Sequence, residues 1–157
     1  MRVIGIDPGS RICGYGIIEW RDGGKYIASG RIEASRRAPL HIRLREIHDA
    51  LVEIIRQYRP ADAAIEKVFF AKGARAALNL GHARGISLLA ASSEGLSVYE
   101  YTASEVKKAI VGYGRAEKRQ VQEMVMVMLD LNMALSPDSA DALALSICHL
   151  NTIRLIG

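Results

Sequence analysis

Residues 3–9 read Val3-Ile4-Gly5-Ile6-Asp7-Pro8-Gly9, an apolar run that ends in an acid and a turn-forming Pro-Gly pair. The apolar residues predict a β-strand over residues 2–7, and the pair predicts the turn that follows it. A second apolar run, Ala63-Ala64-Ile65-Glu66-Lys67-Val68-Phe69, also contains an acid. Carboxylates are seldom buried without a partner, so each of these acids calls for a compensating positive charge.

The rest of the chain predicts further strands and a series of helices. Arg21-Asp22-Gly23-Gly24 separates strand-like runs at 12–20 and 25–33, which is a strong hairpin pattern. Pro39 and Pro60 bracket apolar residues at spacings of three and four, which predict an amphipathic helix. Further strands are expected at 62–68 and 96–101, and further helices at 74–93, 103–111, 116–131 and from Pro137 onward.

This order of elements predicts a single α/β domain over residues 1–157, with a mixed five-stranded sheet flanked by helices on both faces. The hairpin supplies the antiparallel part, and helical crossovers make strands one, four and five parallel. A hydrophobic content of 50% provides enough apolar material for one buried core.

The predicted topology gathers four acids at one edge of the sheet. If strands one and four are neighbours, Asp7 and Glu66 lie side by side at their carboxyl ends, ~5 Å apart. Asp138 and Asp141 are one helical turn apart at the head of the last helix. Several carboxylates together favour a divalent cation, and oxygen ligands suit Mg²⁺ or Mn²⁺. Paired Mg²⁺ ions are a common device for cleaving phosphodiesters.

Charge and composition narrow the partners and the compartment. The net charge is +4, from 21 basic and 17 acidic residues, and the pI is about 9.2. A mildly basic surface suits a polyanionic partner. Cys13 and Cys148 match no zinc or CxxC spacing and indicate a reducing compartment. No signal peptide or membrane-spanning stretch is evident, so a cytoplasmic location without membrane contact is expected.

Most of these residues also have an ordinary structural explanation when taken one at a time. Asp7 before Pro-Gly could be a turn residue, and Asp138 beside Pro137 could simply favour the helix dipole. Glu66 is harder to explain, because a strand interior of Ala, Ile and Val offers it no structural role. The four acids together favour a metal site.

Four segments of the chain carry a family resemblance: Ile6–Ser10, Ile65–Lys72, Gly112–Lys118 and Asp138–Ala144. They resemble the signature blocks of the RuvC family of bacterial Holliday junction resolvases. The resemblance covers nearly the whole chain in the right order and spacing. It implies a ribonuclease H-like fold and a homodimer that cuts two opposed strands of four-way junction DNA symmetrically. It also implies work with a branch-migration motor of the RuvA and RuvB type, in recombination and repair.

The resemblance further implies roles for individual residues. Asp7, Glu66, Asp138 and Asp141 would be catalytic metal ligands for a pair of Mg²⁺ ions, for which Mn²⁺ would substitute. One ion would activate a water and the other would stabilise the leaving 3′ oxygen, giving 5′-phosphate and 3′-hydroxyl ends. Lys118 resembles a catalytic basic residue near the scissile phosphate. Lys107 resembles a second basic position of the DNA cleft.

A loop after the fourth strand is the predicted DNA wedge. Phe69 and Phe70 are the only phenylalanines of the chain, and Lys72 and Arg75 follow closely. Aromatic side chains in a basic loop suit stacking on unpaired bases, worth ~1–3 kcal/mol per base. By resemblance Phe69 is the better candidate, although two adjacent phenylalanines alone would more often be core.

Gly81 and Gly85 lie four residues apart on the alanine-rich helix at 74–93, so two backbones could approach closely there. The glycines alone favour packing of this helix on its own sheet. A four-way junction has near-twofold symmetry, however, and an isologous dimer matches it. A dimer through this helix is therefore expected.

Three other functions fit part of the pattern. An actin-like ATPase or sugar kinase also ends its first strand in an Asp-x-Gly turn, but it needs a second lobe that 157 residues cannot supply. Another ribonuclease H-like metal nuclease, acting on RNA or single strands, would carry the same acids. A non-catalytic nucleic-acid-binding module would not need all four.

Overall fold

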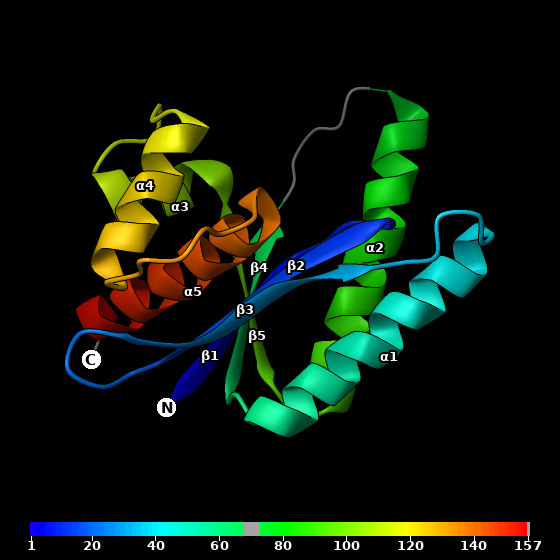
Figure 1. The fold of residues 1–157 in the computed structure, drawn as a ribbon, viewed down its shortest axis with the longest axis horizontal. Helices are drawn as coiled ribbons and strands as arrows, with labels where there is room; N and C mark the ends of the chain where they lie inside the picture. The colour runs from blue at the N-terminus through cyan, green and yellow to red at the C-terminus, as the bar shows by residue number, and fades with distance from the viewer. Residues whose placement is uncertain (68–72, 157) are drawn as a thin grey trace.

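The structure, a computed structural model, describes residues 1–67 and 73–156 (Figure 1). Within these residues the strands are β1 (Arg2–Asp7), β2 (Ile12–Glu19), β3 (Lys25–Glu33), β4 (Asp62–Lys67) and β5 (Ser97–Thr102). The helices are α1 (Leu40–Tyr58), α2 (Ala74–Ser93), α3 (Ala103–Val111), α4 (Lys118–Met128) and α5 (Pro137–Ile156). The predicted element order is confirmed.

The strands form one sheet in the order β3-β2-β1-β4-β5. β1 pairs antiparallel with β2, and β2 pairs antiparallel with β3. β4 lies parallel to both β1 and β5. The mixed sheet is the predicted one, and it makes β1 and β4 neighbours whose carboxyl ends meet at the same edge.

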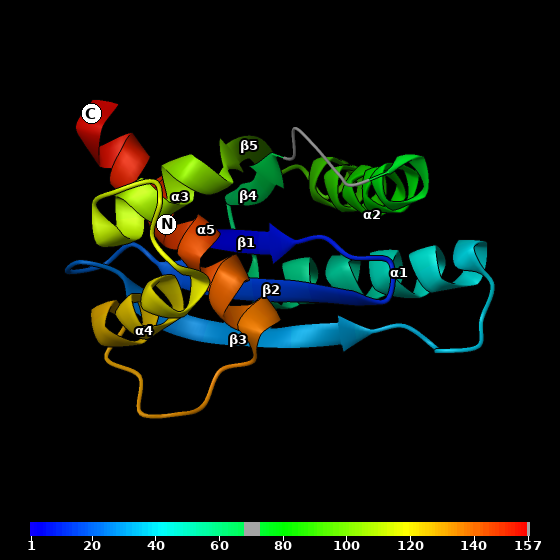
Figure 2. The same ribbon diagram turned by 90° about the horizontal axis from the view of Figure 1, so that it is seen from above.

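Helices cover both faces of the sheet, as predicted. On one face α1 and α2 pack over a buried cluster that includes Ile4, Ile65 and Leu51. On the other face α3, α4 and α5 pack over a cluster that includes Ala64 and Leu143. Figures 1 and 2 both show α1 and α2 together on one side and α3 to α5 on the other. None of the helices in the described ranges combines the length and the apolar character that a bilayer span requires.

α5 approaches the sheet backbone closely because β1 and β2 carry glycines beneath it. A Cβ atom at Gly5 would overlap the carbonyl oxygen of Ala142, and one at Gly14 would overlap that of Asp138. Glycine weakens a strand interior but allows another backbone to come near. The start of α5 is thereby held directly against the beginning of β2.

The start of α5 is also fixed locally. The hydroxyl oxygen of Ser136 accepts a hydrogen bond of 3.1 Å from the backbone N–H of Ser139, and Pro137 occupies the first helical position. Both features favour a helix start at this point. Residues 142–150 are all buried, which accounts for a helix that is apolar on every side.

α4 is shorter than the predicted 116–131. Glu117 and Gln120 form a reciprocal capping box that begins the helix at Lys118. The helix ends at Met128, and Asp130 has a left-handed backbone with φ 50°. The start of α4 matters for the site because it places Lys118 at the helix N-terminus.

Candidate active site

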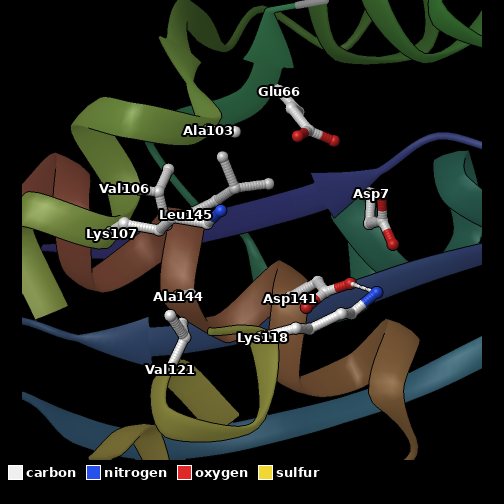
Figure 3. A pocket seen from close by; sticks show the side chains of 10 residues that line it. All are labelled: Asp7, Glu66, Ala103, Val106, Lys107, Lys118, Val121, Asp141, Ala144 and Leu145. Atoms are coloured by element: carbon white, nitrogen blue, oxygen red, sulfur yellow. Dashed lines mark ion pairs between the residues drawn. The ribbon is translucent and has the colours of Figure 1, made fainter. Parts of the chain in front are cut away.

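The carboxyl ends of β1 and β4 form one wall of a pocket of about 240 Å³. The pairing between these two strands ends at Ile6 and Ile65, so Asp7 and Glu66 are the next residues on each strand. Both side chains line the pocket, together with Asp141 from the first turns of α5 (Figure 3). Three of the four predicted acids are therefore brought together from segments far apart in the sequence.

Two lysines line the pocket together with the acids. Lys107 lies on α3 and Lys118 at the start of α4, and apolar residues of α3, α4 and α5 complete the lining. The Nζ atom of Lys118 lies 2.9 Å from Oδ2 of Asp141, the ion pair drawn as a dashed line in Figure 3. The Lys118 side chain is 66% exposed and that of Asp141 is 28% exposed, so the pair sits at the mouth of the pocket.

The acids of the pocket hold their protons more tightly than free carboxyls do. The pKa of Asp7 is raised from its ordinary 3.8 to about 7, chiefly by burial and then by the charges of Asp141, Glu66 and Asp138, against a lowering by Lys118. Burial, and then the charge of Asp141, raise the pKa of Glu66. Clustered carboxyls with raised pKa values mark a place where negative charge is in excess, as at many functional sites.

The pKa shifts of the Lys118–Asp141 pair show what balances that charge. The pKa of Asp141 is raised by burial, although its hydrogen bond from Lys118 lowers it in part. The pKa of Lys118 is raised chiefly by the same hydrogen bond, with Asp7 and Asp138 adding to the effect. Lys118 thus neutralises part of the acidic cluster.

The carboxylates that line the pocket are of the kind that binds a hard divalent cation. Asp7, Glu66 and Asp141 offer carboxylate oxygens, the ligands that Mg²⁺ and Mn²⁺ prefer, and their raised pKa values mean that a bound cation would relieve their repulsion. As the side chains stand, no three acidic, histidine or cysteine residues of the described ranges lie close enough to hold one ion. Asp141 is instead paired with Lys118.

Asp138 lies one turn before Asp141 and is half-buried. It is not among the residues that line the pocket. Its charge nevertheless raises the pKa of Asp7 and of Asp141, so it belongs to the same electrostatic cluster.

The other predicted residues fall elsewhere. Phe69, Phe70 and Lys72 lie outside the described residues. Arg75 is exposed in the first turn of α2 and does not line the pocket. Gly81 and Gly85 are exposed on α2, and a Cβ at either would meet no described atom within 4 Å.

Two features of the site were not predicted from the sequence. The glycines of β1 and β2 that admit α5, namely Gly5, Gly14 and Gly16, are one. Their repeated occurrence inside strands was a usable signal, because glycine within a strand often marks close backbone approach. The second is Arg84 of α2, which donates a hydrogen bond of 3.0 Å to the backbone carbonyl of Glu66. No local pattern distinguishes Arg84 from other helical arginines.

The fold and the site together define a class of protein: a nuclease of the ribonuclease H-like fold, with acids at the carboxyl ends of β1 and β4 and on the last helix. The family model described as "Crossover junction endodeoxyribonuclease RuvC" matches residues 3–149. The chain belongs to the RuvC family.

Curated relatives cover nearly the whole chain. The crossover junction endodeoxyribonuclease RuvC of Syntrophotalea carbinolica is 50% identical over 157 residues, which span 99% of this chain and 97% of that protein. The protein of the same description from Shewanella amazonensis is 52% identical over 151 residues, 96% of this chain and 87% of that protein.

Solved structures agree with this assignment. Thermus thermophilus RuvC in complex with a Holliday junction substrate superposes with a TM-score of 0.93 at 34% identity, over 99% of this chain and 96% of that chain. This match confirms the predicted ribonuclease H-like fold. The Fowlpox virus resolvase bound to Holliday junction DNA gives a TM-score of 0.59 at 13% identity, over 98% of this chain and 99% of that chain, a likeness of fold alone.

Proposed function

We propose that this chain resolves four-way DNA junctions by metal-dependent hydrolysis of phosphodiester bonds. The observation that carries the proposal is the convergence of Asp7, Glu66 and Asp141 in one pocket, together with Lys107 and Lys118, in a chain of the RuvC family. A pocket lined by both acids and lysines suits a phosphodiester, because its charge needs cations on more than one side.

Asp7, Glu66, Asp138 and Asp141 are the residues that would hold Mg²⁺, two ions to a site, with Mn²⁺ as a substitute. Such ions would supply charge that lowers the pKa of a water and stabilises the oxygens of the phosphodiester during hydrolysis. The clustered carboxyls supply the negative charge that would draw the cations in; their pKa values are raised chiefly by burial and in part by one another's charge. The products would carry 5′-phosphate and 3′-hydroxyl ends.

Lys118 would act on the DNA rather than on the protein alone. Its side chain is 66% exposed, and its ion pair with Asp141 holds the ammonium group at the mouth of the pocket. An ammonium held there would stabilise the charge that develops on a phosphate in the transition state. Lys107, which also lines the pocket, would bind the DNA backbone.

The wedge remains a prediction from the sequence. Phe69 would stack on an unpaired base at the junction core, with Phe70, Lys72 and Arg75 beside it. The exposed position of Arg75 in the first turn of α2 is compatible with a contact to DNA phosphate.

A homodimer through α2 would match the twofold symmetry of a junction. Leu78 and Leu89 are 63% and 56% exposed and, with Gly81 and Gly85, follow the helical spacings of three and four residues. No described atom lies within 4 Å of a Cβ built at either glycine, which supports use of this face of α2 by a second copy rather than packing on the sheet of the same chain. Cooperation with motor proteins of the RuvA and RuvB type stays a prediction from the resemblance.

A panel of labelled DNAs with Mg²⁺ tests the proposal: a mobile four-way junction, a linear duplex, a single strand and an RNA–DNA hybrid. Paired symmetric cuts confined to the junction are expected. Cleavage of the hybrid or the single strand would assign the same acids to another kind of ribonuclease H-like nuclease. Tight junction binding without any metal-dependent cleavage would indicate a non-catalytic nucleic-acid-binding module.

A further inference from the structure

Arg84 connects helix α2 to the end of the strand that carries Glu66. Its Nε atom donates a hydrogen bond of 3.0 Å to the backbone carbonyl oxygen of Glu66 on β4. Its Nη2 atom forms an ion pair with the carboxylate of Glu100 on β5. The Arg84 side chain is only 20% exposed, so one guanidinium bridges a helix and two strands in a largely buried place.

The guanidinium reaches Glu66 from behind the site. α2 packs on the face of the sheet that buries Ile65 and Ala63, together with Ala90 and Ala91 of the helix. The Glu66 side chain lies on the other face, where it lines the pocket with residues of α3, α4 and α5. Arg84 therefore binds the backbone of Glu66 and leaves its carboxylate free to face the pocket.

The end of β4 needs such support. The pairing of β4 with β1 ends at Ile6 and Ile65, so Glu66 is the first residue of β4 beyond that ladder. Its partner in the sheet is Tyr101 of β5. Strand ends that are paired on one side only are freer to move, and ligands must be held to within about 0.5 Å for metal chemistry.

We propose that Arg84 is a positioning residue for catalysis: it clamps the carbonyl of Glu66 and the carboxylate of Glu100, and so fixes the Glu66 carboxylate opposite Asp7 and Asp141. This inference rests on the proposed function, in which Glu66 holds a metal ion. Arg84 does not touch DNA or metal in this role and acts only through Glu66.

The chemistry of arginine suits this task better than that of lysine. A guanidinium is planar, and its separate N–H groups donate in fixed directions, here to a carbonyl on one strand and a carboxylate on the next. A lysine ammonium would keep the charge but lose the fixed fork. The positive charge of Arg84 also lowers the pKa of Glu66 against the effect of burial, which helps to keep that carboxyl ionised.

Four variants separate positioning from general stability. Arg84→Met removes both contacts of the guanidinium, and Arg84→Lys keeps only the positive charge. Glu100→Gln weakens the contact to β5 while Arg84 itself is unchanged. Arg56→Met is the matched control, because Arg56 pairs with Glu94 between α1 and the end of α2, away from the pocket. For each variant we would measure the melting temperature, junction binding in EDTA, single-turnover cleavage against Mg²⁺ concentration, and Mn²⁺ affinity without DNA by electron paramagnetic resonance.

Loss of a residue that orients a metal ligand typically weakens metal binding or activity by about 10–100-fold. Arg84→Met should therefore raise the Mg²⁺ concentration for half-maximal cleavage, and weaken Mn²⁺ binding, by about tenfold or more, with junction binding in EDTA within about twofold of the parent protein. Arg84→Lys should resemble Arg84→Met more than the parent. Glu100→Gln should show a smaller shift in the same direction, and Arg56→Met none.

Unchanged Mg²⁺ and Mn²⁺ dependence in Arg84→Met, even with a lowered melting temperature or a slower maximal rate, would overturn the proposal. Full rescue by Arg84→Lys would overturn the clamp as well, since charge alone would then suffice. If Arg84→Met does not fold, Glu100→Gln decides by the same readouts. If the parent protein cuts no junction, the proposed function fails, while the Mn²⁺ affinities still test Arg84.

Discussion

The Nζ atom of Lys118 lies 2.9 Å from Oδ2 of Asp141, so the first residue of α4 is ion-paired with a candidate metal ligand on α5. The pair joins α4 to α5 and places a cation beside the acids that line the pocket. This lysine neutralises part of the acidic charge, since it lowers the pKa of both Asp7 and Asp141. A metal ion bound to Asp141 would leave the ammonium free to turn to a phosphate.

Lys118→Met should slow single-turnover cleavage of a junction by about 10²-fold, because it removes a cation that stabilises the transition state. Junction binding in EDTA should change far less, since other basic residues hold the DNA. Arg119→Met is the neighbouring control: Arg119 is 87% exposed and pairs only with Glu123 on its own helix among the described contacts, so its loss should leave the rate nearly unchanged. Equal effects of the two changes would contradict a special role for Lys118.

Asp7→Asn should abolish cleavage yet stabilise the metal-free protein at pH 8. The pKa of Asp7 in the folded chain is about 7, above its ordinary 3.8, so its favourable contribution to folding is complete below about pH 4 and lost as pH rises through about 7. The asparagine should raise the free energy of unfolding at pH 8 by an amount on the order of 1–2 kcal/mol, and by almost nothing near pH 4.

Thermal unfolding in EDTA across this pH range measures the difference. The control is Asp22→Asn in the exposed β2–β3 turn, which should leave the pH dependence of the melting temperature as it is in the parent. If the metal-free Asp7→Asn protein melts below the parent at pH 8, then the ionised Asp7 carboxylate does not destabilise the folded protein.

Mg²⁺ binding should weaken as the pH falls below about 7. A ligand carboxyl must lose its proton to bind metal, and the pKa of Asp7 lies at about 7. The Mg²⁺ concentration for half-maximal cleavage should therefore rise about tenfold between pH 8 and pH 6. Cleavage measured at several Mg²⁺ concentrations and pH values provides the test, and a requirement that is flat over this range would remove Asp7 from the ligand set.

Gly14→Ala should displace the first turn of α5 from the sheet. The new methyl group would overlap the backbone of Asp138, so the first turn of α5 would have to shift, at a cost of about 1–3 kcal/mol in stability. Cleavage should fall more steeply than stability, because Asp138 and Asp141 both move with that turn. Gly23→Ala, in the open hairpin turn, is a control that brings backbone strain without contact to α5. Normal cleavage by Gly14→Ala would contradict this account.

Gly85→Glu should convert the proposed dimer to a monomer. A twofold interface through α2 would bring both copies of the new carboxylate together and weaken association by about 10²-fold or more. Met133→Glu, an equivalent change at a residue that is 48% exposed before α5, should leave the association unchanged. Sedimentation analysis at micromolar protein measures the association of both variants. A Gly85→Glu protein that is still dimeric would show that the interface does not use this face of α2.

The sequence alone was enough for the order of elements, the mixed sheet and the set of candidate acids. These follow from local properties: apolar runs bounded by Pro and Gly, the Gly23-Gly24 hairpin, and helical spacing after Pro39. Asp7 and Glu66 stood out because each is an acid within an apolar strand, and burial of an acid always needs an explanation.

Only the tertiary structure could decide how those acids are held and what balances them. Arg84 donates a hydrogen bond to the Glu66 carbonyl, and Lys118 forms an ion pair with Asp141. Gly14 allows the backbone of Asp138 to come close. Each of these contacts joins separate elements. Such contacts depend on how helices seat on the sheet, which local periodicity does not encode. The sequence therefore identifies the charged residues of the site, whereas their partners are determined by how the helices pack on the sheet.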